Sequence, residues 1–189
     1  MQTTPYDTRL TYEDLLLLYA DDGRRHEIID GEHYVTPSPT TRHQVLVGRL
    51  YFEVELFLRQ HAGAGRVFLA PLDVLFSKWD LVEPDLLFVA NDQDEIVTKP
   101  NVQGPPALVV EILSPGTRRT DEQVKRRLFD RGGVREYWLV DPELDLVKVY
   151  RRQDDGTFPR VAELTSESHD VLTTPLLPGL TIQLDALFA

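Results

Sequence analysis

Residues 107–113 read Ala-Leu-Val-Val-Glu-Ile-Leu, an apolar run that is interrupted only by Glu111. Short runs of this kind, rich in Val and Leu and bounded by prolines and polar turns, are typical of buried β-strands. An ionised carboxylate inside such a strand is costly unless a cation, a hydrogen-bond network or a metal compensates its charge. We therefore expect a cationic group close to Glu111.

The sequence on either side of this run predicts a strand-helix-strand unit. A second acid, Asp85, lies in the apolar run 83–89, and residues 114–117 form a sharp loop after the Glu111 strand. A helix from about 121 to 131 and a strand over 136–140 follow. Such a crossover places its helix on one face of the sheet, so the loop and the start of the helix lie near one strand end.

The other predicted elements surround this unit. Apolar residues at spacings of three and four predict helices over 12–19 and about 43–61. Runs bounded by turns predict strands over 26–29, 33–35, 66–70, 72–76, 146–150 and 159–164. Residues 91–104 read as a loop with a little helix, and 176–188 as a strand and a short helical turn. We expect a mixed α/β fold, with one mixed β-sheet flanked by helices, in a single domain over residues 1–189 whose core spans about 10–185.

Composition excludes several functional classes. The 189 residues contain no cysteine, which rules out disulfides, thiolate zinc sites and cysteine nucleophiles. The N-terminus lacks the pattern of a secretion signal, and no apolar run approaches the roughly 20 residues that span a bilayer. We expect a soluble, cytoplasmic protein without a membrane partner.

Charge is unevenly distributed along the chain. The net charge of −11 argues against a protein that coats nucleic acid through its overall field. Residues 117–135, however, carry seven Lys or Arg against three acids, so this segment has a charge of +4 and the remainder −15. The segment is either a phosphate-facing surface or a solvated helix face. The candidate phosphate contacts are Arg118, Arg119 and Arg126.

Two acids and a lysine suggest metal chemistry. Mg²⁺ takes oxygen ligands from one or two carboxylates, waters and a substrate phosphate. Asp85 and Glu111 fit that requirement, and Lys125, which shares a helix face with Asp121, could hold an attacking water. The alternative is that both acids are ion-paired or lie at strand ends.

These residues belong to longer motifs. They are Pro84-Asp85, Val110-Glu111-Ile112-Leu113-Ser114-Pro115, Asp121 with Lys125, and the segment 133–141, Gly-Val-Arg-Glu-Tyr-Trp-Leu-Val-Asp. Together with Asp30-Gly31-Glu32, Pro37-Ser38-Pro39 and His43, they resemble the bacterial Uma-two family of restriction endonucleases, within the PD-(D/E)XK nuclease superfamily. The resemblance covers roughly residues 10–185.

The resemblance implies a restriction-endonuclease-like fold and Mg²⁺- or Mn²⁺-dependent hydrolysis of phosphodiester bonds in nucleic acid, with DNA the expected substrate and a homodimer the expected assembly. Asp85 and Glu111 would be metal ligands, and Glu32 the additional carboxylate. The family motif places its lysine two residues after the second acid, where this chain has Leu113. Lys125 is the candidate substitute for that lysine as the third catalytic residue.

Three further residues are auxiliary candidates. His43 could approach the metal or serve in helix capping and packing, and Ser114 could touch phosphate or cap its turn. Asp121 precedes Lys125 by one turn.

Two rival functions remain. A degenerate nuclease fold that acts as a dimeric interaction module would explain Leu113 and the acidic remainder of the chain. A carboxylate-pair glycoside hydrolase would need an aromatic-lined cleft, which two tryptophans hardly supply.

Overall fold

The computed structural model describes residues 9–18 and 23–189. The first helix, α1 (Tyr12–Leu18), begins where the sequence predicts, while its predicted end at Tyr19 lies outside the described residues. The long helix α2 (Thr41–Gln60) is capped by the hydroxyl of Thr40, which accepts a hydrogen bond from the amide of His43 at 3.2 Å.

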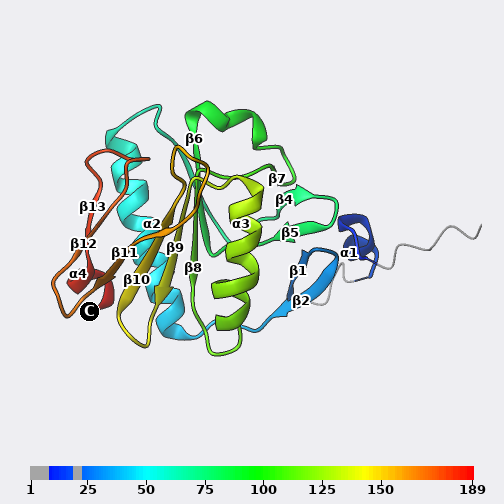
Figure 1. Cartoon of the computed structure of the whole chain (residues 1–189), viewed down its shortest axis with the longest axis horizontal. Coiled ribbons are helices and arrows are strands. Elements are labelled where there is room, and N and C mark those ends of the chain that lie inside the picture. The colour runs from blue at the N-terminus through cyan, green and yellow to red at the C-terminus, as the bar shows by residue number, and fades with distance from the viewer. Residues whose placement is uncertain (1–8, 19–22) are drawn as a thin grey trace, which may run out of the picture.

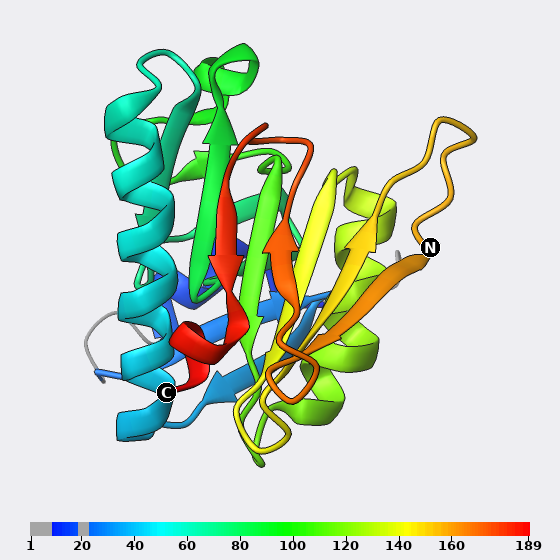
Figure 2. The same ribbon diagram turned by 90° about the vertical axis from the view of Figure 1, so that its left-hand side faces the viewer.

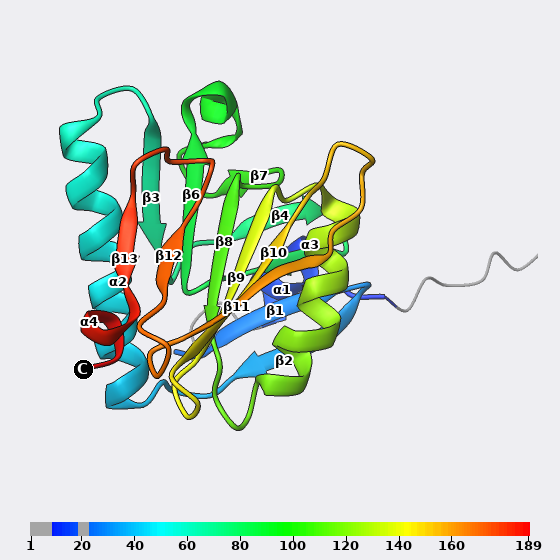
Figure 3. The same cartoon turned by 60° about the vertical axis from the view of Figure 1, so that its left-hand side comes forward.

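A six-stranded sheet forms the centre of the molecule (Figure 3). Its strands, in spatial order, are β11 (Arg160–Thr165), β10 (Leu146–Arg151), β9 (Glu136–Asp141), β8 (Leu108–Ile112), β6 (Leu86–Ala90) and β3 (Gly65–Leu69). Only β8 and β9 run parallel, because the predicted crossover helix connects them, and the other neighbours are antiparallel. The predicted mixed sheet is confirmed for this part of the chain.

The remaining strands form two further sheets, which the single-sheet expectation did not include. Five strands pair in the order β2 (Glu32–Thr36), β1 (Arg25–Ile29), β5 (Asp80–Val82), β4 (Val74–Ser77) and β7 (Val102–Gln103). The 3₁₀ turn η1 (Asn91–Ile96) precedes β7. Near the C-terminus, β12 (Val171–Thr173) pairs with β13 (Thr181–Gln183), and α4 (Leu184–Phe188) follows. The strands on either side of Pro71, β3 and β4, therefore belong to different sheets.

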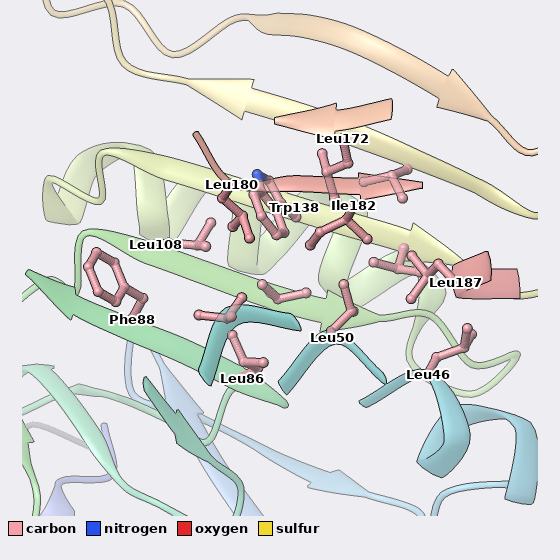
Figure 4. Close-up of a cluster of buried hydrophobic side chains, with 14 of the residues drawn as sticks. Leu46, Leu50, Leu86, Phe88, Leu108, Trp138, Leu172, Leu180, Ile182 and Leu187 are labelled. Carbon is pink, nitrogen blue, oxygen red and sulfur yellow. The ribbon is translucent and has the colours of Figure 1, made fainter. Parts of the chain in front are cut away.

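The central sheet is covered on both faces. Helix α2 and the β12–β13 pair lie on one face, and α3 (Arg126–Gly132) lies on the other, toward the five-stranded sheet (Figures 1 and 2). Figure 4 shows the first interface, where Leu46 and Leu50 of α2 pack with Leu86, Trp138 and Ile182. Among the described residues, no helix has both the length and the apolar character needed to cross a bilayer.

Alternation along the strands decides which side chains meet. Even-numbered residues of β6 and β8, such as Phe88 and Val110, lie in the core under α2, while odd-numbered ones, such as Leu87 and Val109, lie in the core under α3. Glu111 has odd parity, so it points toward α3 and the five-stranded sheet.

The segment entering α3 is a wide π-helical turn, η2 (Thr120–Lys125). The sequence predicted an ordinary helix over this region, starting near Asp121. Isolated π-helical turns often occur at functional sites. Asp121 and Lys125 are the buried residues of η2, so this side of the turn faces the sheet beneath it.

Candidate functional site: a buried carboxylate cluster around Lys125

Four carboxylates from four elements are buried around one lysine. They are Glu27 of β1, Asp85 directly before β6, Glu111 of β8 and Asp121 of η2, and each is between 1% and 4% exposed. Lys125 is 1% exposed. The two sheets and the π-helical turn therefore supply side chains to one place, which we call the carboxylate cluster.

Lys125 connects three of these elements, β1, β8 and η2. Its Nζ atom lies 2.8 Å from Glu111 Oε1, 2.8 Å from Glu27 Oε1 and 3.4 Å from Asp121 Oδ1. Burial alone would lower the pKa of Lys125, but the three carboxylates raise that pKa well above its ordinary value. The ammonium thus stays charged at neutral pH.

Asp85 has a different set of partners. Its Oδ1 atom accepts a hydrogen bond from Arg25 Nη1 at 3.0 Å, and its Oδ2 atom lies 3.0 Å from His43 Nε2 and accepts from the amide of Ile112 at 2.9 Å. Burial favours the neutral acid, yet these donors and charges lower the pKa of Asp85 to about 2. Asp85 is therefore ionised at neutral pH.

The rest of the cluster is short of positive charge. Burial, together with repulsion from the neighbouring carboxylates, raises the pKa of Glu111 well above its ordinary value, despite Lys125. Burial, again against the attraction of Lys125, also raises the pKa of Asp121. Four carboxylates thus share Lys125 and Arg25, with His43 beside Asp85, so the cluster has more acidic groups than cations to balance them.

A small cavity of about 20 Å³ adjoins these groups, lined by Asp85, Glu111, Asp121 and Lys125 together with His43, Ser114 and the loop before α2. Roughly 10–15 Å³ accommodates one water molecule. The cavity thus has room for a small ligand such as a water molecule or an ion, and a nucleotide would have to bind outside it.

The charge and chemistry of these donors fit a hard divalent cation. Mg²⁺ binds through one or two carboxylates and keeps waters and substrate oxygens for the remaining positions, and Asp85 and Glu111 supply two such carboxylates. A divalent cation would supply positive charge that the cluster lacks. Within residues 9–18 and 23–189, however, no three Asp, Glu or His side chains are arranged as a ready-made metal site, so waters and substrate would have to complete the coordination.

The structure brings most of the candidate residues together. Asp85, Glu111 and Lys125 lie in the cluster with Asp121, and His43 reaches Asp85 from the start of α2. Ser114 lines the cavity, and its hydroxyl lies 2.9 Å from Thr117 Oγ1.

Glu32 does not join this group. It is exposed on β2, where its carboxylate accepts a hydrogen bond from the hydroxyl of Tyr34 at 3.0 Å. Their positions along the hairpin explain the difference, because Glu32 pairs with Ile29 next to the turn, while Glu27 lies two residues farther from the turn, where it reaches Lys125. Glu27 is the carboxylate that sequence reasoning missed. Its signal in the sequence was weaker than that of Glu111, because only Ile28 and Ile29 are apolar in the strand 26–29.

The candidate phosphate-binding arginines are only partly available. Arg118 donates to Asp141 Oδ2 at 2.6 Å and to Glu143 Oε2 at 3.1 Å. The guanidinium of Arg126 lies over the ring of Tyr150, 5.6 Å from its centroid, and Arg119 is exposed. Arg118 is thus a structural ion-pair partner in this state.

Comparisons with known proteins agree with the fold. A crystal structure of "a putative nuclease belonging to DUF820" from Anabaena variabilis ATCC 29413 superposes with a TM-score of 0.77 at 21% identity, covering 95% of this chain and 97% of that one. The "Uncharacterized protein slr1290" of Synechocystis sp. (strain ATCC 27184 / PCC 6803 / Kazusa) is 26% identical over 152 residues, which is 78% of this chain and 77% of that protein. The family model Uma2, described as "Putative restriction endonuclease", matches residues 12–185. The chain therefore belongs to the Uma2 family.

Proposed function

We propose that this protein is a metal-dependent endonuclease that hydrolyses phosphodiester bonds in DNA. The carboxylate cluster carries the proposal, because Lys125 and four buried acids from separate elements form a charged site next to a small cavity. Buried charge of this kind is expensive for a fold to keep, and it is typical of sites that do chemistry. Membership of the Uma2 family supports the same activity.

Asp85 and Glu111 would hold the metal, and both lie at the same end of the central sheet. Bound Mg²⁺ or Mn²⁺ would polarise a phosphate oxygen and offset the excess negative charge of the cluster. Asp85 is suited to bind a cation because its low pKa keeps it ionised. Glu27 and Asp121 would act through Lys125, whose position they fix by ion pairs.

Lys125 would orient the attacking water and stabilise the charge that develops on the phosphate. Its pKa is raised, so it acts as a donor and not as a base. This assignment gives Lys125 the place of the family motif's lysine, which is Leu113 here. Leu113 packs in the apolar core under α3, so it adds no polar group to the site.

The test is nicking of supercoiled plasmid by purified protein with Mg²⁺ or Mn²⁺, compared with EDTA. We expect metal-dependent nicking that Asp85→Asn and Lys125→Met abolish. Asp155→Asn is the matched control, since Asp155 is exposed in a turn and pairs only locally with Thr157. Failure of the pure protein to cut DNA with any divalent metal would refute the proposal.

A second candidate function has an observation in its favour. Arg25 and His43 already bind Asp85, and among the described residues no three acidic or histidine side chains form a complete metal site. A nuclease fold that serves as a dimeric interaction module would look like this. Calorimetry with Mn²⁺ separates the nuclease from the interaction module, since a module binds no metal. Sedimentation measures whether the predicted homodimer exists.

The cytoplasmic location of the protein stays a prediction.

A further inference from the structure

Arg25 lies at the boundary between the carboxylate cluster and open solvent. Its Nη1 atom donates to Asp85 Oδ1 at 3.0 Å, and the side chain is 23% exposed. Besides the small cavity of the cluster, Arg25 lines two larger hollows. One has a volume of about 510 Å³ and is bounded by β1, the end of β2 and the Pro37–Pro39 loop, and the other has a volume of about 460 Å³. A group too large for the small cavity could therefore approach the site at Arg25.

The guanidinium is incompletely satisfied where it stands. Its Nε atom is buried and has no hydrogen-bond partner among the described residues. A buried donor without an acceptor is unfavourable, and a planar guanidinium suits a phosphate, which can accept two of its N–H groups at once. Arg25 is thus a partly exposed cation at the edge of the cluster that has one unpartnered N–H group and lines a hollow that a nucleotide could enter.

Arg25 also competes with any metal. It neutralises Asp85, and Glu111 and Glu27 attract it as well. A divalent cation bound to Asp85 would repel this guanidinium, because like charges would then share one carboxylate. Departure of Arg25 toward the 510 Å³ hollow would satisfy both requirements, since the metal gains Asp85 and the substrate gains a phosphate ligand.

We infer that Arg25 is a substrate-binding residue, one that covers Asp85 in the free protein and turns to a DNA phosphate in the adjoining hollow when DNA binds, more completely when a metal occupies Asp85. This inference rests on the proposed nuclease function. None of the arginines predicted from the sequence has this position, because those predictions all fell on the basic segment 117–135.

The test is a double-mutant cycle on DNA binding in EDTA, with a short fluorescently labelled DNA duplex as the probe and Asp85→Asn, Arg25→Gln and their combination as variants. Freeing Arg25 in Asp85→Asn should tighten binding by about tenfold, the size of one charge-assisted hydrogen bond. Arg25→Gln should bind more weakly than wild type, and the double variant no more tightly than Arg25→Gln. The control cycle uses Glu55→Gln and Arg59→Gln, an ion pair on α2 with a similar contact at 2.8 Å that lies outside the basic segment 117–135, and should show no coupling.

Equal tightening by Asp85→Asn with and without Arg25 would overturn the inference, because that result reports only the lost negative charge. DNA binding by Arg25→Gln as tight as wild type, or no binding by any variant, would also overturn it. Arg25→Lys keeps the charge without the planar donor pair, and its binding should fall between wild type and Arg25→Gln, which provides the readout if Arg25→Gln fails to fold. Because the cycle needs no metal and no cleavage, a protein that cuts no DNA would refute the nuclease proposal while the cycle still decides the role of Arg25.

Discussion

Lys125 Nζ and Glu111 Oε1 lie 2.8 Å apart, and this ion pair joins the π-helical turn η2 to strand β8 where both side chains are almost fully buried. The pair is unequal in its surroundings. Lys125 has three carboxylates near it, whereas Glu111 shares Lys125 with Glu27 and Asp121. Removing the charge of Lys125 should therefore destabilise the protein, whereas removing the charge of Glu111 should stabilise it.

Lys125→Met should destabilise the protein by about 3–5 kcal/mol, the usual cost of leaving buried charges without their partner. Urea unfolding at pH 7 in EDTA measures this free energy. Lys148→Met is the control, because Lys148 pairs at 2.9 Å with the partly exposed Glu122, and its loss should cost about 1 kcal/mol or less. Equal effects of the two substitutions would show that the cluster contributes little.

Glu111→Gln should stabilise the metal-free protein at pH 8 by about 1 kcal/mol or more. The folded-state pKa of Glu111 is raised, first by burial and then by the neighbouring carboxylates, so the folded state holds a proton that the unfolded chain releases. The cost of ionising Glu111 is therefore absent below its unfolded pKa and grows as the pH rises toward the folded pKa.

The measurement for Glu111 is urea unfolding of both proteins in EDTA from pH 4 to pH 8. The difference should be small at pH 4 and should increase with pH in favour of Glu111→Gln. Glu163→Gln, an exposed substitution on β11, should show no such trend. A Glu111→Gln protein that is less stable than wild type at pH 8 would contradict the charge imbalance inferred for the cluster.

Two glycines, one at the end of α3 and one in α2, test how tightly α3 packs on the residues beneath it. A Cβ atom on Gly132 would lie 2.5 Å from the Phe76 ring, which packs on Phe129 beneath α3, so Gly132→Ala should cost about 1–3 kcal/mol. A Cβ atom on Gly48 in α2 would meet nothing within 4 Å, so Gly48→Ala should stabilise by about 0.5–1 kcal/mol. Thermal unfolding of both variants checks the opposite signs, and a neutral Gly132→Ala would mean that Phe76 can move aside.

Local pattern predicted the central sheet well, since a buried strand such as 107–113 and a long amphipathic helix such as α2 have clear periodicities. It did not predict β5 or β12, because each has only three residues and too short a pattern to recognise. Pairing was harder still. The local sequence of β3 and β4 does not show that they belong to different sheets, because strand pairing depends on contacts between residues that are remote in sequence.

The site shows the same limit. Asp85 and Glu111 were identified because each lies in or beside an apolar strand, and Lys125 because it shares a helix face with Asp121 and is the candidate substitute for the lysine of the family motif. Arg25 and Glu27 were not, since their roles depend on a second sheet folding against the first. The hairpin β1–β2 was predicted, but its turn motif drew attention to Glu32 instead of the inward-facing acid.

The choice between Glu27 and Glu32 gives the sharpest test of the site. Both are glutamates on one hairpin, but Glu27 is 1% exposed and lies 2.8 Å from Lys125 Nζ, whereas Glu32 is exposed and bonds only locally to Tyr34. Glu27 Oε1 also accepts a hydrogen bond from the amide of Glu83 at 2.9 Å, and this bond fixes the backbone two residues before Asp85. Loss of this carboxylate should therefore disturb both Lys125 and Asp85.

We expect Glu27→Gln to lower the rate of metal-dependent DNA nicking by about a hundredfold, as loss of a residue that orients catalytic groups commonly does. Glu32→Gln should nick DNA at a rate within about twofold of wild type, because surface substitutions away from a site have small effects. Circular dichroism of both variants checks that they fold. If Glu32→Gln inactivates the protein and Glu27→Gln does not, the essential acid lies at the turn of the hairpin, and Lys125 with its carboxylates is a structural feature of the core.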